Sequence, residues 1–333
     1  MNKDNDTRPI SFDSFVGQKA VIDVLRRAIV AARSSNRACS HMLLTGGPGL
    51  GKTSIASMIA HEMGTNLHAI MAPAVEHKGA LIGLLTGARA GDVIFIDEIH
   101  ALKPALQECL YSALEDGVVD LQAGKRVIRM TLAPFTLIGA TTRAALLTAP
   151  LRDRFAYTFQ LRPYAADAIA EIVRRAANPL GLVIEPAACA EIARRSRGVP
   201  RVALRLLRAA RDFAASAGCG PFVSTVCAAA ALDAIGVDEL GLEGTDRSYL
   251  TIVAAAGAPI GLDAVCAELG EERRTIEEVV EPYLLAAGLI RRTRAGRVVA
   301  AAGVAHLQPK EPRWAPEDRM IGGGNVEDAE VLS

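Results

Sequence analysis

The sequence lacks the long hydrophobic runs that membrane-spanning helices need. Although half of its 333 residues are hydrophobic, no run approaches the roughly 18 apolar residues of a membrane span. Residues 1–8 mix charged and amide side chains and have neither the apolar centre nor the cleavage site of a secretory signal. We therefore expect a soluble, cytoplasmic protein with no membrane partner.

Paired cysteines and an excess of one charge are missing as well. The six cysteines include no Cys-x-x-Cys pair, and the six histidines show no metal-site spacing. We therefore expect neither disulfides nor a protein-held transition metal. The 37 basic and 37 acidic residues leave no net charge, so no overall positive field indicates nucleic acid. Locally, however, four arginines and no acidic residue lie between Gly288 and Ala300, which leaves a basic surface segment open.

The length of the chain and its changing periodicity indicate several domains. One hydrophobic core stops growing at about 250 to 300 residues. Residues 1–163 alternate apolar strands with helical patterns, which is typical of an α/β domain with a doubly wound parallel sheet. Residues 164–238 have the pattern of an all-α domain, and residues 239–307 have the element order of a winged helix. Residues 308–333 form a polar tail rich in proline and glycine that we expect to be disordered.

Short apolar runs in the first domain predict its strands. We place them at His41–Thr45, Leu67–Met71, Asp92–Ile96 and Phe135–Ala140. The segment Val118–Met130 has glycines among alternating apolar residues, so it predicts a hairpin inserted into the domain rather than a core strand.

A glycine-rich loop follows the first of these strands. Gly46–Thr53 reads Gly-Gly-Pro-Gly-Leu-Gly-Lys-Thr and opens a helical pattern. Small residues let successive backbone N–H groups turn inward and cradle phosphates at the helix N-terminus. We expect Lys52 to reach the β and γ phosphates of ATP and Thr53 to place its hydroxyl on Mg²⁺. The other residues expected to bind the nucleotide here are Gly47, Pro48, Gly49, Gly51 and Ser54.

Two acidic residues follow the apolar run 93–96. Asp97 and Glu98 are expected at the carboxyl edge of the sheet, beside the phosphates. Asp97 suits an outer-sphere Mg²⁺ ligand, and Glu98 suits the base that aligns and polarises the attacking water. A solvated strand end is the alternative for the pair alone, but together with Lys52 it indicates a hydrolase.

Further polar residues could complete this site. Thr141 and Thr142 end the next strand, where a hydroxyl could orient water or the γ-phosphate, although a turn-forming pair is equally open. Arg154 could be an arginine finger, or it could simply pair with Asp153. Arg201 opens a helix of the second domain and could reach back to the nucleotide.

Taken together, these residues resemble the RuvB family, the AAA+ motors that drive Holliday junction branch migration. The resemblance runs from about Arg8 to Ala301 and implies an AAA+ ATPase domain, an α-helical lid and a winged helix. The motifs that carry it in the ATPase domain are Arg8-Pro9, Phe15–Gln18, Asp97–His100, Phe135–Arg143 and Pro150–Phe155.

The resemblance also implies roles for single residues. By it, Thr142 is sensor 1, Arg201 is sensor 2, Tyr164 packs near the adenine, and Arg154 is the finger supplied to a neighbouring subunit. A finger that acts in trans implies a ring, expected to be a homohexamer. The resemblance adds these residues to the nucleotide-binding set: Arg8, Val16, Gly17, Glu115 and Asp116.

The implied activity is that of an ATP-driven double-stranded DNA translocase in recombination and repair. The stretches 270–273, 281–284 and 292–297 resemble the DNA-binding third domain of the family. No aromatic residue lies among the arginines, so contact with phosphates is favoured over base stacking. The hypothesis is that Arg273, Arg292 and Arg297 hold the DNA backbone; a solvated basic face is the alternative.

The predicted hairpin lies where the family docks on its junction-binding partner RuvA, and RuvC is a further expected partner. Ile128 and Met130 keep the apolar character of the family at these positions, but the hairpin tip is several residues shorter than usual. Gly47 and Gly117 also replace bulkier residues of the family. Two alternatives therefore stay open: a divergent RuvB-like paralogue with a different RuvA partner or none, and a clamp-loader-like AAA+ switch. The basic winged domain argues against the switch.

Overall fold

The computed structural model describes residue 9, residues 11–123 and residues 126–308. The chain divides into two compact units, residues 1–242 and residues 243–333. Within the described ranges, no helix is both long and apolar enough to cross a membrane. All six cysteines lie in these ranges, and all are free thiols.

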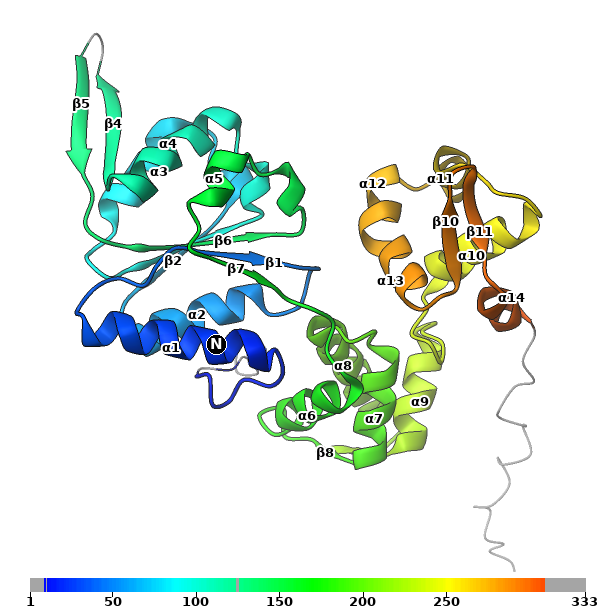
Figure 1. The fold of residues 1–333 in the computed structure, drawn as a ribbon. Helices are drawn as coiled ribbons and strands as arrows, with labels where there is room; N and C mark the ends of the chain where they lie inside the picture. The colour runs from blue at the N-terminus through cyan, green and yellow to red at the C-terminus, as the bar shows by residue number, and fades with distance from the viewer. Residues whose placement is uncertain (1–8, 10, 124–125, 309–333) are drawn as a thin grey trace, which may run out of the picture. The chain divides into compact units, whose positions relative to one another are not determined.

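A five-stranded parallel sheet is the centre of the first unit (Figure 1). The strand order is β2-β3-β6-β1-β7. Side chains of the central strands alternate between the two faces of the sheet, and both faces are covered, so these strands are mostly apolar. The strands are β1 (Met42–Thr45), β2 (Leu67–Met71), β3 (Val93–Asp97), β6 (Thr136–Thr141) and β7 (Tyr157–Gln160).

The sequence predicted four of these five strands to within one residue at each end. It missed β7, which pairs only with β1 at the edge of the sheet. Of its four residues only Phe159 is buried. An edge strand with one buried side chain has too little apolar periodicity to be recognised from sequence.

Helices cover both faces of the sheet. In Figure 1, α1 and α2 lie on one face and α3, α4 and α5 on the other. Helix α1 shows why it packs there: its buried residues recur at helical spacing, at Ile22, Leu25, Ile29 and Ala32. The helices are α1 (Lys19–Ser34), α2 (Lys52–Met63), α3 (Lys78–Gly87), α4 (Pro104–Glu115) and α5 (Ala149–Asp153), with short 3-10 turns at Ala72–Ala74, Ile99–Ala101 and Ala144–Leu146.

The predicted hairpin is present and extends away from the sheet (Figure 1). Strand β4 (Val118–Ala123) pairs antiparallel with β5 (Arg126–Thr131). Ile128 is exposed, whereas Met130 packs against the core beneath the hairpin. The residues at the very tip, 124–125, lie outside the described residues.

A four-helix bundle follows the sheet domain. The sequence predicted an all-α domain, and the structure adds a short parallel pair, β8 (Val183–Ile184) with β9 (Phe222–Val223). Buried Arg195 joins two helices, because its guanidinium binds Glu191 on its own helix and Asp233 on another. The helices are α6 (Ala166–Ala177), α7 (Pro186–Arg195), α8 (Pro200–Ser216) and α9 (Thr225–Ala234).

The second unit has the helix and strand order expected of a winged helix. A π-helical segment, Ile276–Val280, joins α12 directly to α13. The predicted tail includes residues 309–333, which lie outside the described residues. The elements are α10 (Gly244–Ala255), α11 (Leu262–Leu269), α12 (Arg273–Thr275), α13 (Glu281–Ala286), β10 (Ile290–Thr293), β11 (Gly296–Val299) and α14 (Ala301–Leu307).

Candidate functional site

The glycine-rich loop joins β1 to α2 and depends on its glycines. Gly46, Gly49 and Gly51 all have positive φ, at 139°, 79° and 101°. A Cβ added to Gly49 would lie 2.7 Å from the Cβ of Arg201. Only glycine fits such a backbone at such close approach. The loop therefore presents backbone N–H groups at the N-terminus of α2, where an anion is favoured.

Lys52 is buried inside this loop. Its Nζ donates hydrogen bonds to the carbonyl oxygens of Gly46 at 2.8 Å and Gly47 at 3.0 Å. Burial lowers the pKa of Lys52, and the nearby carboxylates of Asp97 and Glu98 oppose that effect. The ammonium is thus held at the loop, next to both acidic residues.

A cavity of about 840 Å³ opens beside the loop. It is bounded by the N-terminal segment, the loop, the end of β3 and the lid formed by α6–α9. Two glycines predicted to bind the nucleotide, Gly17 and Gly47, are not part of its lining. The carbonyl oxygen of Gly47 accepts a hydrogen bond from Lys52, and Gly17 packs against Tyr164, whereas Arg8 lies outside the described residues. The predicted residues that line the cavity are Val16, Pro48, Gly49, Gly51, Lys52, Thr53, Ser54, Asp97, Glu98, Tyr164 and Arg201.

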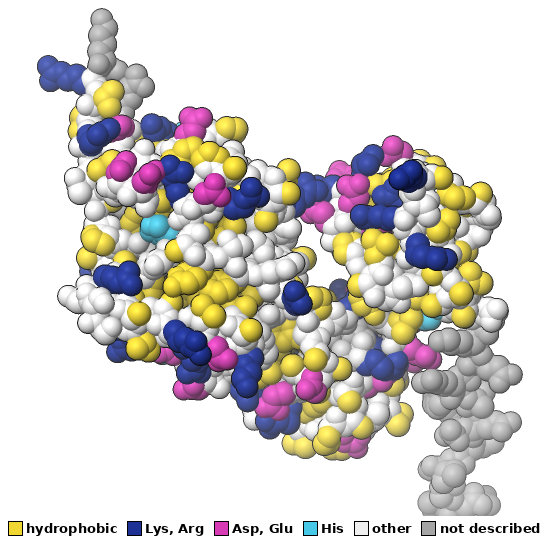
Figure 2. Space-filling view, in the orientation of Figure 1, with side chains coloured by type: hydrophobic (Ala, Val, Ile, Leu, Met, Phe, Trp, Pro, Cys, Tyr) yellow, Lys and Arg dark blue, Asp and Glu magenta, His cyan; other side chains and the backbone are white. Residues whose placement is uncertain are grey.

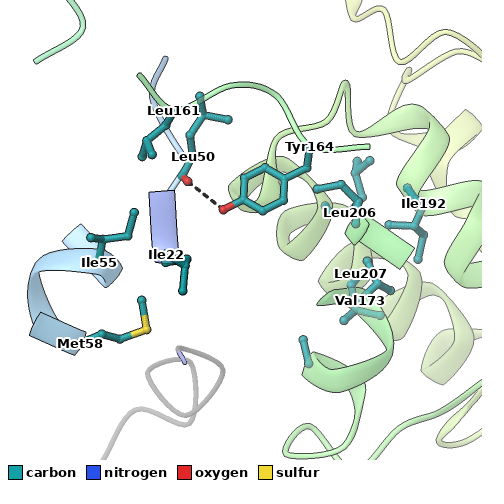
Figure 3. Close-up of a cluster of buried hydrophobic side chains, with 14 of the residues drawn as sticks. Ile22, Leu50, Ile55, Met58, Leu161, Tyr164, Val173, Ile192, Leu206 and Leu207 are labelled. Carbon is teal, nitrogen blue, oxygen red and sulfur yellow. Dashed lines mark hydrogen bonds between the residues drawn. The ribbon is translucent and has the colours of Figure 1, made fainter. Parts of the chain in front are cut away.

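Tyr164 connects the loop to the lid. Its hydroxyl donates to the carbonyl oxygen of Leu50 at 3.1 Å (Figure 3). Burial raises the pKa of Tyr164 to about 12, so the hydroxyl keeps its proton at neutral pH. A Cβ on Gly17 would lie 2.4 Å from the ring. The ring therefore fixes the N-terminal segment as well as the loop.

Arg201 brings the lid to the phosphate loop. It lies in the first turn of α8, and its backbone N–H donates to the carbonyl oxygen of Gly49 at 3.4 Å. The charge of Arg201 contributes to lowering the pKa of Lys52, as expected of two neighbouring cations. An anion between them would relieve this repulsion.

The acidic pair ends β3. Glu98 is in the left-handed region with φ of 50°, and its N–H donates to Asp97 Oδ1 at 3.0 Å. Such a conformation is uncommon for a residue other than glycine and is a local strain. Thr142 donates its hydroxyl to Glu98 Oε2 at 3.2 Å. The structure thus brings the expected base and the expected sensor together.

The neighbouring threonine has a different role. Thr141 is fully buried, and its Oγ1 accepts a hydrogen bond from the N–H of Arg143 and lies 2.9 Å from His100 Nδ1. His100 is a site residue to which the sequence assigned no role. The available signal was its position two residues after Glu98, at the same edge of the sheet.

Arg154 lies away from the cavity lining. It donates to Glu115 and, at 2.7 Å, to the carbonyl oxygen of Pro150. Its guanidinium also lies 5.1 Å from the centre of the Tyr111 ring. The ion pair is therefore with Glu115 on α4 rather than with Asp153. Glu115 is the last residue of α4 and Asp116 follows it, so both expected nucleotide residues lie near Arg154.

Arginines of the winged unit bind one buried carboxylate. Glu281 is fully buried, and it accepts hydrogen bonds from Arg297 Nε at 2.7 Å, Arg292 Nε at 2.9 Å and the Tyr249 hydroxyl at 2.6 Å. The side chain of Arg292 remains 49% exposed, whereas that of Arg297 is 16% exposed. Arg273 is exposed and pairs with Asp263 and Glu277. Figure 2 shows dark-blue basic side chains on the visible face of this unit.

These features define a class of protein. A phosphate loop between a parallel strand and a helix, an acidic pair at the end of β3, which β6 separates from the strand before the loop, and a helical lid with an arginine at the loop are those of an AAA+ P-loop ATPase. Three family models cover the chain: the Holliday junction DNA helicase RuvB P-loop domain over residues 7–161, the RuvB AAA lid domain over 164–238 and the RuvB C-terminal winged helix domain over 239–308. The chain belongs to the RuvB family.

Individual relatives agree with this assignment. The chain is 47% identical over 312 residues to the Holliday junction branch migration complex subunit RuvB of Paramagnetospirillum magneticum, covering 92% of this chain and 90% of that one. The structure of the Thermotoga maritima RuvB Holliday junction branch migration motor is similar, with a TM-score of 0.82 and 41% identity over 92% of this chain and 99% of that one. A mutant of the same motor gives a TM-score of 0.84.

Proposed function

We propose that this chain is an ATP-driven double-stranded DNA translocase that moves Holliday junctions in recombination and DNA repair, in the cytoplasm. One observation carries the proposal: the lysine of the phosphate loop, both carboxylates at the end of β3 and an arginine of the lid face one cavity. A motor needs such a site, because a nucleotide bound at the loop then also contacts the lid and can change the position of the lid.

The site suits ATP with Mg²⁺. A loop of positive-φ glycines at a helix N-terminus and the cations of Lys52 and Arg201 favour phosphates. The Thr53 hydroxyl and the Asp97 carboxylate are the hard oxygen ligands that Mg²⁺ prefers, with Asp97 acting in the outer sphere. Bound ATP would supply the phosphoanhydride bond whose hydrolysis drives the motor.

Glu98 is the proposed base. Its carboxylate aligns the attacking water and polarises it, while the Thr142 hydroxyl holds one carboxylate oxygen. Lys52 balances negative charge that develops on the phosphates, and Arg201 reports the nucleotide to the lid.

The ring is the proposed working state. Arg154, Glu115 and Asp116 lie together and away from the cavity lining within the described part of the chain. A nucleotide that they contact is therefore that of a neighbouring subunit. A closed ring, proposed to be a homohexamer, lets every subunit supply Arg154 to the next one.

DNA is proposed to be held through its phosphates by the winged unit. Arg273 and Arg292 are proposed to contact the backbone, because their side chains are largely exposed although both pair with carboxylates, whereas the mostly buried Arg297 supports the wing through Glu281. RuvA is proposed to dock on the hairpin at exposed Ile128, with Met130 anchoring the strand beneath, and RuvC is a further proposed partner.

The short hairpin favours one second candidate, a RuvB-like paralogue with another RuvA-type partner or none. Both are tested with the purified protein, a four-way junction and ATP, with and without RuvA, by scoring strand separation and ring formation. Branch migration that needs RuvA supports the first proposal. ATP turnover on plain duplex without junction movement supports the paralogue.

A further inference from the structure

A histidine side chain lies directly behind the proposed base. The His100 side chain is only 6% exposed, and its Nδ1 is 3.1 Å from Glu98 Oε2. The same nitrogen is 2.9 Å from Thr141 Oγ1. His100 does not line the cavity, so its ring meets Glu98 from the protein side.

The two contacts indicate where the proton of the imidazole lies. Glu98 Oε2 is a carboxylate oxygen and can only accept, so an unprotonated Nδ1 would place two lone pairs 3.1 Å apart. With the proton on Nδ1, one N–H is shared between Glu98 Oε2 and Thr141 Oγ1, and both contacts are favourable. Thr141 is buried at the end of β6 and is fixed there by the N–H of Arg143.

We propose, on the basis of the function proposed above, that His100 is a positioning residue for Glu98. Three groups meet the same carboxylate oxygen, Oε2: His100 Nδ1 lies 3.1 Å from it, and the hydroxyl and the backbone N–H of Thr142 donate to it at 3.2 Å and 3.4 Å. Contacts from three groups on one oxygen fix the rotation of the carboxylate and leave the other oxygen, Oε1, to water. The imidazole also ties the end of β3 to the end of β6.

Such support is needed at this position. Glu98 has φ of 50°, which is a left-handed backbone conformation that residues other than glycine seldom adopt, so neighbouring groups must stabilise it. A base that rotates away from the water retains its charge but loses its alignment. Loss of His100 should therefore reduce kcat for ATP and leave nucleotide binding nearly unchanged.

Two substitutions of similar polarity test the inference. The side-chain amide nitrogen of asparagine is as many bonds from the backbone as Nδ1 of histidine. The side-chain amide nitrogen of glutamine is as many bonds from the backbone as Nε2. We expect His100→Gln to lower kcat about 10- to 100-fold, the loss of one hydrogen bond to a charged group. His100→Asn should recover most of that loss. KM for ATP, the affinity for a non-hydrolysable ATP analogue and the unfolding midpoint should stay close to those of the parent.

A second arm covers poor folding of either variant. His100→Ala is assayed with and without imidazole, and added imidazole should raise its kcat. Three outcomes would each overturn the inference while the parent still hydrolyses ATP. They are an equal kcat in the parent and in His100→Gln, equal losses of kcat in the Asn and Gln variants, and a kcat of His100→Ala that does not respond to imidazole. A parent without ATP turnover would instead sink the proposed function, and the inference with it.

Discussion

Arg154 is anchored on α4, where it donates to Glu115 and lies over the ring of Tyr111 one turn earlier. Tyr111 is itself held, because its hydroxyl is 2.6 Å from Thr148 Oγ1. The guanidinium is therefore pre-positioned by its own subunit. An arginine finger needs this, since a freely rotating side chain would lose entropy on reaching a neighbour's phosphate.

Replacing Arg154 should separate binding from turnover. We expect Arg154→Ala to bind ATP normally and to lose about 10³- to 10⁵-fold in kcat, the usual worth of an arginine finger. The measurement is steady-state ATP turnover with a parallel binding titration. Arg152→Ala, which alters a neighbouring exposed arginine, is the matched control.

Mixed rings test whether this arginine acts in trans. A Glu98→Gln subunit keeps Arg154 and can supply it to an Arg154→Ala neighbour that keeps Glu98. Mixing the two inactive variants should therefore restore part of the turnover. Mixtures as inactive as their components, despite ring formation, would contradict an action in trans.

Gly49 should control how the lid meets the loop. A Cβ at Gly49 would lie 2.7 Å from the Cβ of Arg201, so Gly49→Ala should push the lid away and weaken nucleotide binding at least about tenfold, as the loss of one charged contact would. Gly64→Ala is a close control, because Gly64 also has positive φ but has no atom within 4 Å of the added Cβ. Calorimetric titration with nucleotide measures both variants, and an equal loss in the control would refute the steric explanation.

The wing arginines should differ in what they support. Arg292→Ala should weaken duplex binding regardless of sequence and reduce the slope of log affinity against log salt by about 1, the effect of one lost phosphate contact. Arg297→Ala should leave the salt slope unchanged and lower the free energy of unfolding of the winged unit by about 1 to 3 kcal/mol, because Glu281 stays buried with one fewer donor. Arg292→Ala also removes a donor from Glu281 and should cost some stability too, so the salt slope is the quantity that separates the two variants. Fluorescence titrations over a salt series and denaturant melts give the two quantities. An Arg297→Ala variant with normal stability and a reduced salt slope would place Arg297 on the DNA.

Asp92 predicts how stability depends on pH. Burial alone would raise the pKa of Asp92, but hydrogen bonds from His68, the N–H of Arg89 and both nitrogens of Asn66 lower it to about 2. In the unfolded chain the pKa of an aspartate is about 4. The ionised Asp92 therefore stabilises the folded protein at pH values above about 4, and this stabilisation is lost as the pH falls towards about 2.

Asp92→Asn should therefore cost about 2 kcal/mol at neutral pH, and the difference from the parent should shrink in that acid range. Denaturant melts at several pH values measure it. Asp13→Asn is the control, because the Asp13 ion pair with Arg26 is exposed and contributes little. A constant difference between Asp92→Asn and the parent from neutral pH to about pH 2 would disprove the linkage.

Sequence was most informative where function depends on adjacent residues. The phosphate loop and the pair Asp97-Glu98 are short motifs that also fix their own local structure. The partners of Arg154 and Arg297 could not be predicted in the same way, because Glu115 is 39 positions from Arg154 and Glu281 is 16 positions from Arg297. Only the packing of helices and strands brings those charges together.

The cysteines have a practical consequence. Burial raises the pKa of the thiols of five of them, which makes those thiols poor nucleophiles near neutral pH; they are Cys39, Cys109, Cys189, Cys227 and Cys266. Cys219, between α8 and α9, is exposed. A maleimide dye should therefore label the natural sequence at a single point on the lid. Nucleotide-driven lid movement can then be followed by fluorescence without engineering any cysteine in or out.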